Sequence, residues 1–590
     1  MPYRPSQKLN LSLTPRAFWA WAAALTLLRL AVTAFQQGYT WVGGAPLDDE
    51  LMFRAANAIT AGQWLGTYDY LTLSKAMFFP VWLALLHALH LPYLTAGAAL
   101  WCAAAGLAAA ALRPLWAAAT AGHGRTLTLG LYAALAFLPS SWAAYTLRVY
   151  RDNIFPALCL LVFAGFAGAL LRAAQNPAAQ NPAAQTGTKP PRLWPWLLAA
   201  GAGLAAGYLD REDAGLFLLP AAALATLALA VLCVRRRRGL SLAAQLLPYG
   251  LLAGGVLAFC TLNYTHYGVF TLSDFSSGSF ADAMGAMSRV ATASEEPQLS
   301  VPADARALLY EAVPELEPLA YWLEEDPQMR NDFRDPELED YRAGSFYWAI
   351  RRAAQFEGIY DSAAGAESYW AAVAEKINAA CASGALPVRA GDTGVRSGTT
   401  QPIRARYVLP TLQECFRSLY WVLTFQDCAP YESLRSIGTE EDIALWSGYL
   451  GCGFNAAAEA GKDTPYYSPQ QKAVFRLLDA LRLCAALLTT LCFVLAVLCQ
   501  LRALPRLFGK AAKGVADLGW RRLAWALPVV LLAFAALRCA MIAFVEVSSF
   551  GIGTSTMYLA TVHPLVVLFN YASLWPVLIP AGRGRGDANV

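Results

Sequence analysis

Two adjacent carboxylates near the start of the chain are the first side chains whose types and spacing could perform acid–base chemistry. Asp48 and Asp49 follow the first apolar run, and Lys75, Arg148 and Arg151 lie further along, each close to an apolar segment. A carboxylate can remove a proton from a hydroxyl, while cations stabilise a departing phosphate. The plain alternative for the acidic pair is the first turn of a helix, where carboxylates stabilise the helix dipole by about 0.3–1 kcal/mol.

Further ionisable residues lie at the ends of apolar segments or within them. Those at the ends mix acids with bases and could support an acceptor or a phosphate: Asp152, Asp210, Arg211, Glu212 and Asp213. Inside a span, a charge costs about 2.5–3.5 kcal/mol at the bilayer centre. We expect Arg538 to contact a lipid phosphate and Arg29 to reach the membrane interface with its long side chain. His563 precedes Pro564, and it either joins the phosphate site or is a satisfied imidazole at a helix kink.

The elements that must position these residues are membrane helices. The 590 residues are 57% hydrophobic and 15% charged, with a mean hydropathy of +0.39, whereas soluble domains are roughly 45–50% apolar and about 25% charged. This composition excludes a soluble single-core globule and a disordered chain. The 45 basic and 41 acidic residues leave a net charge of only +4, so no nucleic-acid partner is expected.

Ten apolar runs approach the roughly 20 residues that a helix needs to cross a bilayer. They occupy residues 17–36, 94–112, 126–147, 153–171, 193–209, 214–234, 243–262, 477–501, 523–545 and 556–579. The run at 77–91 is shorter and is bounded by Pro80 and Pro92, so we expect a helix lying along the interface. The predicted fold is an all-α polytopic membrane protein with about ten transmembrane helices and one juxtamembrane helix.

Basic residues concentrate in the loops on one side of the predicted membrane, including four consecutive Arg at 235–238. Because short cytoplasmic loops collect Lys and Arg, this side is predicted to be cytoplasmic, together with both termini. The chain is then a multi-pass protein of the cytoplasmic membrane. The repeat AAQNPAAQNPAAQ within residues 173–187 is too polar to pack and predicts a cytoplasmic linker.

This topology divides the chain into three parts. Residues 1–262 form an N-terminal transmembrane module whose first outer loop, 37–92, carries the acidic pair; residues 263–476 form a mainly helical exported domain; and residues 477–590 form a C-terminal transmembrane module. Four of the twelve cysteines fall in the exported part: Cys381, Cys415, Cys428 and Cys452. An even number in an oxidising compartment predicts two disulfides, with three possible pairings. A zinc site is the weaker reading, because neither a CxxC motif nor a His partner accompanies them.

The N-terminal part resembles the membrane glycosyltransferases of the C-type fold, which include protein O-mannosyltransferases and lipid A aminoarabinose transferases. The resemblance covers roughly the first 270 residues and rests on the segments Asp48-Asp49, Thr72-Leu73-Ser74-Lys75 and Arg148-Val149-Tyr150-Arg151-Asp152, with a helix that ends at Gly62. One departure is that Ala76, Met77 and Phe78 precede Pro80, whereas many relatives have proline directly after the equivalent of Lys75.

The resemblance implies an activity and a set of roles. Such enzymes take a sugar from a polyprenyl-phosphate donor and transfer it on the outer membrane face, to a glycan, lipid or protein. Asp48 corresponds to the catalytic carboxylate, with Asp49 as its companion, and Lys75, Arg148, Arg151, Arg538 and His563 are candidates to hold the donor phosphate. Some members use a divalent cation such as Mg²⁺ or Mn²⁺ at the acidic pair and others use none, so a metal at Asp48 and Asp49 stays open.

The leading hypothesis is therefore an inverting glycosyltransferase in which Asp48 is the general base. No GxGxxG or P-loop motif occurs in a suitable context, which favours a lipid donor over a nucleotide donor. The alternatives are a transporter or flippase for a lipid-linked or polar solute, and a nonenzymatic envelope assembly protein. A transporter predicts inverted repeats and ionisable residues at the midplane, whereas here the ionisable residues gather near the outer edge.

Overall fold

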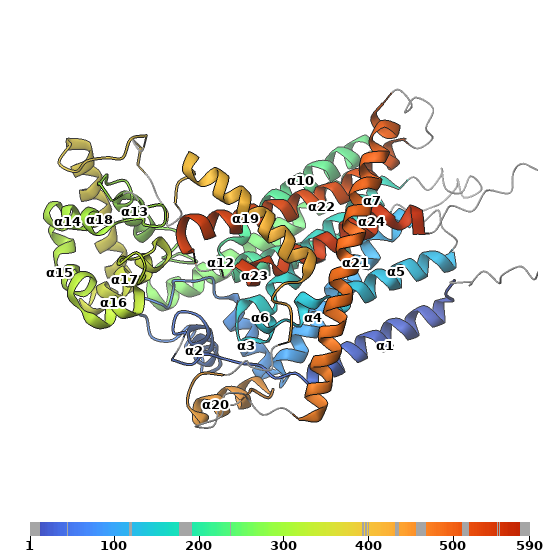
Figure 1. The fold of residues 1–590 in the computed structure, drawn as a ribbon, viewed down its shortest axis with the longest axis horizontal. Helices are drawn as coiled ribbons and strands as arrows, with labels where there is room; N and C mark the ends of the chain where they lie inside the picture. Colours follow the sequence, from blue (N-terminus) through green and yellow to red (C-terminus); the bar gives the residue numbers. More distant parts are fainter. Residues whose placement is uncertain are drawn as a thin grey trace, which may run out of the picture.

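The computed structural model describes residues 12–578, apart from residues 44, 117–120, 176–190, 237, 295, 392–393, 396–397, 399–400, 431–435, 456–467, 510–517, 552 and 554. The described residues are mainly helical, and their only β-type pairings are isolated bridges. Apolar helices fill one part of the elongated molecule and shorter helices fill its other end (Figure 1). Most of the predicted linker at 173–187 and the end of the last predicted span lie outside the described residues.

Seven described helices are long and apolar enough to cross a membrane. They are α1 (Pro15–Ala34), α4 (Tyr93–Leu112), α7 (Phe155–Ala174), α10 (Ala214–Arg235), α12 (Leu247–Tyr267), α21 (Pro469–Phe508) and α22 (Leu518–Val545). Local signals fix several ends: Thr14 caps α1 through the backbone N–H of Ala17 at 3.2 Å, and Gly268 ends α12 with φ of 76°. The prediction of an all-α polytopic membrane protein is confirmed at this level.

The remaining three predicted spans have a different character. The run at 126–147 is broken: α5 (Ala121–Ala136) is followed by short helical turns from Pro139 to Leu147 that bend away by 52°. Proline cannot continue the α5 hydrogen-bond ladder, which accounts for the break. The other two are α9 (Trp194–Asp210) and α24 (Val562–Leu578), each of 17 residues. Both pack among the longer helices.

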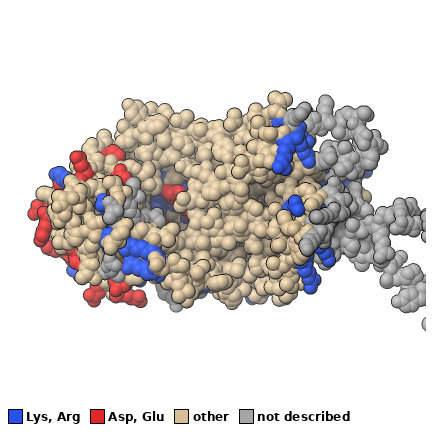
Figure 2. Space-filling view, turned by 90° about the horizontal axis from the view of Figure 1, so that it is seen from above, with Lys and Arg blue, Asp and Glu red and all other residues tan. Residues whose placement is uncertain are grey.

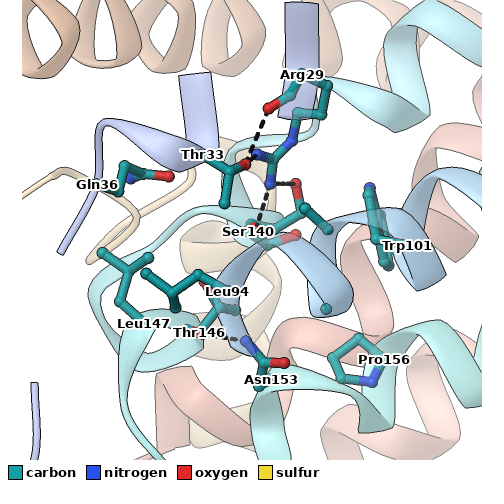
Figure 3. A pocket seen from close by; sticks show the side chains of 13 residues that line it. Arg29, Thr33, Gln36, Leu94, Trp101, Ser140, Thr146, Leu147, Asn153 and Pro156 are labelled. Atoms are coloured by element: carbon teal, nitrogen blue, oxygen red, sulfur yellow. Dashed lines mark hydrogen bonds between the residues drawn. The ribbon is translucent and has the colours of Figure 1, made fainter. Parts of the chain in front are cut away.

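Arg29 holds the broken segment in place instead of reaching the membrane interface as expected. Its guanidinium donates to the carbonyl oxygens of Ala136 at 3.1 Å and Ser141 at 2.8 Å, and it also donates to the Thr33 hydroxyl. Figure 3 shows Arg29 pointing from α1 toward Thr33 and the Ser140 turn, beside a cavity of about 20 Å³. The expectation for Arg29 was wrong because the helix break frees backbone carbonyls that bind the cation within the protein.

Small residues allow α7 and α9 to cross closely. A Cβ atom added at Gly168 would lie 2.1 Å from the Trp196 ring, and one at Gly203 would lie 2.6 Å from the carbonyl oxygen of Leu158. Such contacts are too short for any side chain, so the backbones of the two helices are in direct contact, as is common between membrane helices. This crossing positions the C-terminal end of α9 at Asp210, which the predicted site residues Arg211, Glu212 and Asp213 follow.

The first loop lies against the ends of these helices. It contains α2 (Asp49–Thr60) and α3 (Phe78–Ala88), and the latter corresponds to the short helix predicted at 77–91. Residues before α2 are tied to distant segments by backbone bridges, from Tyr39 to Arg148 and from Trp41 to Ile437. The bridges bring the start of α2 beside the segment that follows the broken span.

A second core lies outside the apolar helix bundle. It is built by α13 (Ser279–Met287), α14 (Ala303–Ala312), α15 (Glu317–Ala320), α16 (Pro327–Phe333), α17 (Ala343–Phe356) and α18 (Ala363–Ser383), which we call the charged helical domain. Gly358 adopts φ of 71° between α17 and α18, a left-handed conformation that glycine reaches without a steric cost. Acidic and basic side chains cover this domain, the middle of the visible face is nearly free of charge, and basic side chains lie near the opposite end (Figure 2).

Two later helices leave the charged helical domain. α19 (Ala405–Thr424) packs along α22 and α21, and α20 (Glu440–Leu450) packs against α3. Trp446 of α20 stacks on Phe53 of α2, with ring centroids 4.1 Å apart. The described part of residues 263–476 therefore contributes to three places in the structure. It forms the charged helical domain, it packs through α19 against α21 and α22, and it packs through α20 against α2 and α3 of the first loop.

Candidate active site

The acidic pair lies where the first loop, the segment after the broken span and the α9–α10 connection meet. Asp48 directly precedes α2 and Asp49 is its first residue. Lys75 lies just before α3, and Arg148 and Arg151 follow the last short helix of the broken span. Contacts that span up to 100 positions of sequence join four of these predicted residues, and Arg151 reaches them through the Tyr150 hydroxyl.

Asp49 is the buried member of the pair. Its side chain is fully buried, its Oδ1 atom accepts from Arg148 Nε at 2.6 Å and lies 2.5 Å from Nη2, and its Oδ2 atom accepts from the backbone N–H of Trp41 at 3.2 Å. Burial raises the pKa of Asp49 to about 6 despite the attraction of Arg148. Asp49 is therefore placed to orient Arg148 and the Trp41 backbone, and it has no open face for a substrate.

Asp48 is the open member of the pair, with 35% of its side chain exposed. It forms an ion pair with Lys75, accepts from the Tyr150 hydroxyl at 3.0 Å and lies 3.5 Å from Nη2 of Arg148. Burial alone would raise its pKa, but Lys75 and Arg148 hold the pKa of Asp48 well below its ordinary value. The exposed carboxylate is thus ionised and faces two cations.

Tyr150 links these charges, although the prediction of site residues did not include it. Its hydroxyl accepts from Lys75 Nζ at 3.2 Å and from Arg151 Nη2 at 3.0 Å while it donates to Asp48. Burial raises the pKa of Tyr150 far above its ordinary value, so the phenol stays protonated. Its ring also lies under the Arg148 guanidinium, 5.1 Å from ring centroid to Cζ.

Two tryptophan side chains from other parts of the chain lie beside the cations of the candidate site. Trp41 lies under the Arg148 guanidinium at 4.4 Å, and Trp348 of α17 lies 5.4 Å from Lys75 Nζ. Trp348 in turn stacks on Phe275 with centroids 4.5 Å apart. The charged helical domain therefore touches the candidate site directly through Trp348.

Arg151 and Glu212 form the neighbouring ion pair. Arg151 Nη1 donates to both carboxylate oxygens of Glu212 at 2.9 Å and to the Asp210 backbone oxygen at 3.0 Å. Glu212 also accepts from the backbone N–H of Ala76 at 2.6 Å. Burial would raise the pKa of Glu212, but Arg151 and this N–H keep it below the ordinary value. The pair thereby fixes the backbone next to Lys75.

A third group of charges lies deeper, toward α22. Arg211 binds Asp152 at 3.0 and 3.1 Å and Asp213 at 3.1 Å. Arg538 is fully buried and binds Asp213 at 2.6 Å. Contact between Arg538 and a lipid phosphate stays a prediction; within the protein, Arg538 Nη1 faces the Asp213 carboxylate. Nε and Nη2 of Arg538 have no hydrogen-bond partner within the described chain.

The structure also gives the surroundings of two further predicted residues, His563 and Asp210. His563 stacks on Phe425, with ring centroids 4.8 Å apart, and no described contact joins it to the acidic pair. This stacking at the start of α24 fits the alternative of a packed imidazole, and the phosphate role of His563 stays a prediction. Asp210 is buried beside Arg151, but both of its carboxylate oxygens lack a partner within the described chain, so it contributes its backbone oxygen alone.

The charges of this cluster nearly balance. The cations are Lys75, Arg148, Arg151, Arg211 and Arg538, and the carboxylates are Asp48, Asp49, Asp152, Asp210, Glu212 and Asp213. Every cation has a carboxylate partner, so an incoming anion must compete for it. No group of three or more His, Cys, Asp or Glu residues suited to a metal occurs within the described part of the chain. The acidic pair offers two carboxylates, and each already faces a cation.

The predicted disulfides are not formed. Cys381, Cys415, Cys428 and Cys452 are free thiols that lie in different places. Cys381 belongs to the core of the charged helical domain, whereas Cys428 lies 3.5 Å from the Tyr145 hydroxyl in the apolar bundle. The disulfide prediction treated residues 263–476 as one unit, whereas α19 and α20 pack against other helices and the four thiols are not brought together.

Comparison of the chain with protein-family models, with curated proteins and with solved structures finds no match.

Sequence reasoning missed the aromatic residues around the charges. Tyr150 lies between two predicted basic residues, so its position was a usable signal, and an aromatic ring flanked by cations is a recurrent arrangement. Trp41, Trp348 and Tyr558 gave no such signal, because each reaches the cluster from a separate segment. Tyr558 lies 4.7 Å from the Arg211 guanidinium.

Proposed function

We propose that the protein transfers a sugar from a polyprenyl-phosphate donor to an acceptor on the outer face of the cytoplasmic membrane. The observation that carries this proposal is the open, ionised Asp48 held between Lys75 and Arg148. A base for an acceptor hydroxyl and cations for a phosphate thus lie within one group of contacts. The acceptor is a glycan, lipid or protein outside the cytoplasm.

The topology that belongs to this proposal has ten spans. It counts the broken segment with α5 and the 17-residue helices α9 and α24 as spans, and it places both termini in the cytoplasm. Support comes from the distribution of charge, since basic side chains lie near one end and mixed charges lie over the charged helical domain (Figure 2). The acidic pair then lies at the outer membrane surface, where a lipid-linked donor can reach it.

The proposed reaction is a single displacement. The acceptor oxygen attacks the anomeric carbon as its proton passes to Asp48, and the bond from that carbon to the phosphate oxygen breaks with its electron pair leaving on the phosphate. Inversion at the anomeric carbon follows from one displacement. Tyr150 and Asp49 do not touch the reacting atoms in this scheme and position Lys75 and Arg148.

The pairing of Lys75 with Asp48 suggests how the two substrates are coupled. A phosphate that binds Lys75 through the remaining N–H of its ammonium, beside those that face Asp48 and Tyr150, partly neutralises the cation next to Asp48. Partial neutralisation of a neighbouring cation raises the pKa of a carboxylate, so donor binding makes Asp48 a stronger base. The base is thereby activated only when the leaving group is present.

The test uses the purified full chain with a polyprenyl-phosphate sugar and measures release of free polyprenyl phosphate. Replacement Asp48→Asn should lower release by about a hundredfold to ten-thousandfold, since it removes the base while keeping the shape of the side chain. Glu337→Gln is the matched control, because Glu337 is 86% exposed and lies in the charged helical domain; it should keep wild-type release.

Wild-type turnover by Asp48→Asn would refute the role of that residue as base. Transbilayer movement of the lipid-linked sugar without any release of polyprenyl phosphate would refute the transferase and favour a flippase.

A further inference from the structure

A cavity of about 290 Å³ lies in the charged helical domain, next to the segment that follows α12. Its lining includes Phe270, Asp274 and Gly278 from that segment, and Tyr360, Glu367 and Trp370 from the α18 region. The volume is just below the roughly 300–1,000 Å³ typical of small-molecule sites. It offers room for one small ring and not for a longer chain.

The two carboxylates of this cavity differ in their state. Asp274 is neutralised, since Arg351 Nη2 donates to it at 2.8 Å and the Tyr68 hydroxyl donates at 2.9 Å. Glu367 faces no cation within the described chain, and Oε1 accepts from Ser279 through its N–H at 3.2 Å and its hydroxyl at 2.7 Å. The Oε2 atom has no described protein partner. Glu367 thus presents an uncompensated acceptor to the cavity.

The cavity wall also favours a ring. Trp370 Nε1 donates to the Tyr360 hydroxyl at 3.0 Å, which fixes both aromatic side chains. Gly278 approaches the carboxylate so closely that a Cβ atom there would lie 3.3 Å from both Glu367 oxygens. Fixed aromatic walls with one open carboxylate suit a ligand that carries both C–H surface and several hydrogen-bond donors. An anionic ligand is disfavoured because it would meet Glu367.

The segment at 273–275, which lies beside this cavity, is joined by hydrogen bonds to the segment before Lys75. The backbone N–H of Asp274 donates to the Leu73 carbonyl at 3.0 Å, and the Ser273 hydroxyl donates to the Ser74 carbonyl at 3.4 Å. On the other side, Phe275 stacks on Trp348, the ring beside Lys75. A ligand in the cavity therefore contacts the segment that braces Lys75.

We propose that this cavity binds a single ring bearing several hydroxyl or ammonium groups, such as one sugar unit, and that this unit is part of the acceptor. The assignment to the acceptor rests on the proposed function. The donor is excluded from the cavity by its phosphate. Phe270 at the rim is exposed and lies three residues after the end of α12, so a ligand held near the predicted membrane surface can enter.

Binding is measured by saturation-transfer-difference NMR on the full chain in detergent. The probes are the methyl glycosides of glucose, mannose, galactose and N-acetylglucosamine, together with glucosamine, and glucose 6-phosphate is the anionic control. At least one neutral or cationic probe should bind saturably, and glucose 6-phosphate should bind at least tenfold more weakly. Absence of saturable binding by every probe at tens of millimolar would overturn the proposal.

Three variants locate the binding. Glu367→Gln keeps an acceptor for Ser279 and should weaken binding about tenfold or more, because a hydrogen bond to a charged group is worth about 1.5–3 kcal/mol. Ala366→Phe fills the cavity from its wall and should abolish binding. Glu375→Gln, on the exposed face of α18, is the matched control and should bind as wild type. Equal binding by Glu367→Gln and wild type would refute the site even if Ala366→Phe does not fold.

Binding and transfer are separable in these experiments. Asp48→Asn should bind the probe with wild-type affinity, and in the transfer assay Glu367→Gln should raise the acceptor KM with little change in the donor KM. If the ring binds and no donor is ever turned over, the proposed function fails and the site stands. If transfer occurs and Glu367→Gln leaves the acceptor KM unchanged, the acceptor assignment fails.

Discussion

Arg148 fixes Asp49 from the buried side of the acidic pair, with Nε 2.6 Å and Nη2 2.5 Å from the same Oδ1 atom. The same guanidinium places Nη2 3.5 Å from Asp48. One cation therefore touches both members of the pair, yet one carboxylate is fully buried and the other is open. This asymmetry gives the two neighbouring residues different roles and different responses to pH.

The first prediction concerns the acid limb of the pH profile. Burial raises the pKa of Asp49 to about 6, so this carboxyl gains its charge as the pH rises through that value. Only the ionised form pairs fully with Arg148, so kcat/KM for transfer should rise from pH 5 to pH 7 with an apparent pKa near 6. Asp49→Asn should remove this step and lower the plateau, because Arg148 then loses its charged partner.

The control for this profile is Asp48, whose pKa is held well below its ordinary value by Lys75 and Arg148. Without a bound donor, Asp48 is ionised throughout the range from pH 5 to pH 7 and adds no step there. An acid limb that survives unchanged in Asp49→Asn would show that another group titrates.

The second prediction concerns Tyr150 as a positioning residue. Tyr150→Phe keeps the ring and removes the hydroxyl that contacts Lys75, Arg151 and Asp48. Loss of hydrogen bonds to charged groups should lower kcat about tenfold to a hundredfold, by the roughly 1.5–3 kcal/mol that such bonds contribute. The donor KM should change less than kcat.

Tyr571→Phe is the matched control for this variant, because its hydroxyl donates to the Leu127 carbonyl at 2.7 Å, away from the cluster. A purely structural role for Tyr150 would lower the thermal stability of Tyr150→Phe and leave the kcat of the folded fraction at the wild-type value.

The third prediction concerns the pair of Arg538 and Asp213. Asp213→Asn leaves the fully buried Arg538 without its carboxylate and should destabilise the protein by about 3–5 kcal/mol. Arg538→Met combined with Asp213→Asn should be less destabilised than the sum of the single variants, with a coupling of about 0.5–3 kcal/mol. The measurement is denaturant unfolding in detergent micelles. Additive effects would show that the two side chains do not act as a pair.

The sequence predicted the fold well wherever one apolar run forms one straight helix. Seven of the runs are long enough for this, as in α7 and α10. The run at 126–147 was read as one span although Pro139 interrupts it, because hydropathy sums residues without regard to the backbone hydrogen bonds. The packing of α19 on α22 was also missed, since residues 405–424 were assigned by their charge to the same domain as their predecessors.

The residues that belong to the candidate site were predicted better than the residue that each of them contacts. Position at span ends placed Lys75, Arg148 and Asp48 at one level, and the structure brings them into contact. The choice of ion-pair partner depends on which side chains point toward each other across the helix bundle. The spacing of residues in the sequence does not reveal this. The carboxylate beside Arg538 and the aromatic ring beside His563 were therefore not predicted.

The last prediction concerns Arg29 and the broken segment. Arg29→Met removes the donors that bind the Ala136 and Ser141 carbonyls and leaves these oxygens buried without a partner. An unsatisfied buried group costs about 1–3 kcal/mol, so the variant should unfold at a lower temperature and at lower denaturant concentration. The segment from Pro139 to Leu147 leads directly to Arg148, so its loosening should also reduce transfer.

Arg16→Met is the matched control, because Arg16 lies on the same helix α1 and is exposed; its midpoint should equal that of wild type. Arg29→Lys should fall between the two, since a single ammonium cannot span both carbonyls as the planar guanidinium does. If Arg29→Met unfolds at the wild-type midpoint, Arg29 does not hold the break, and the position of Arg148 must depend instead on its ion pair with Asp49 and on the bridge to Tyr39.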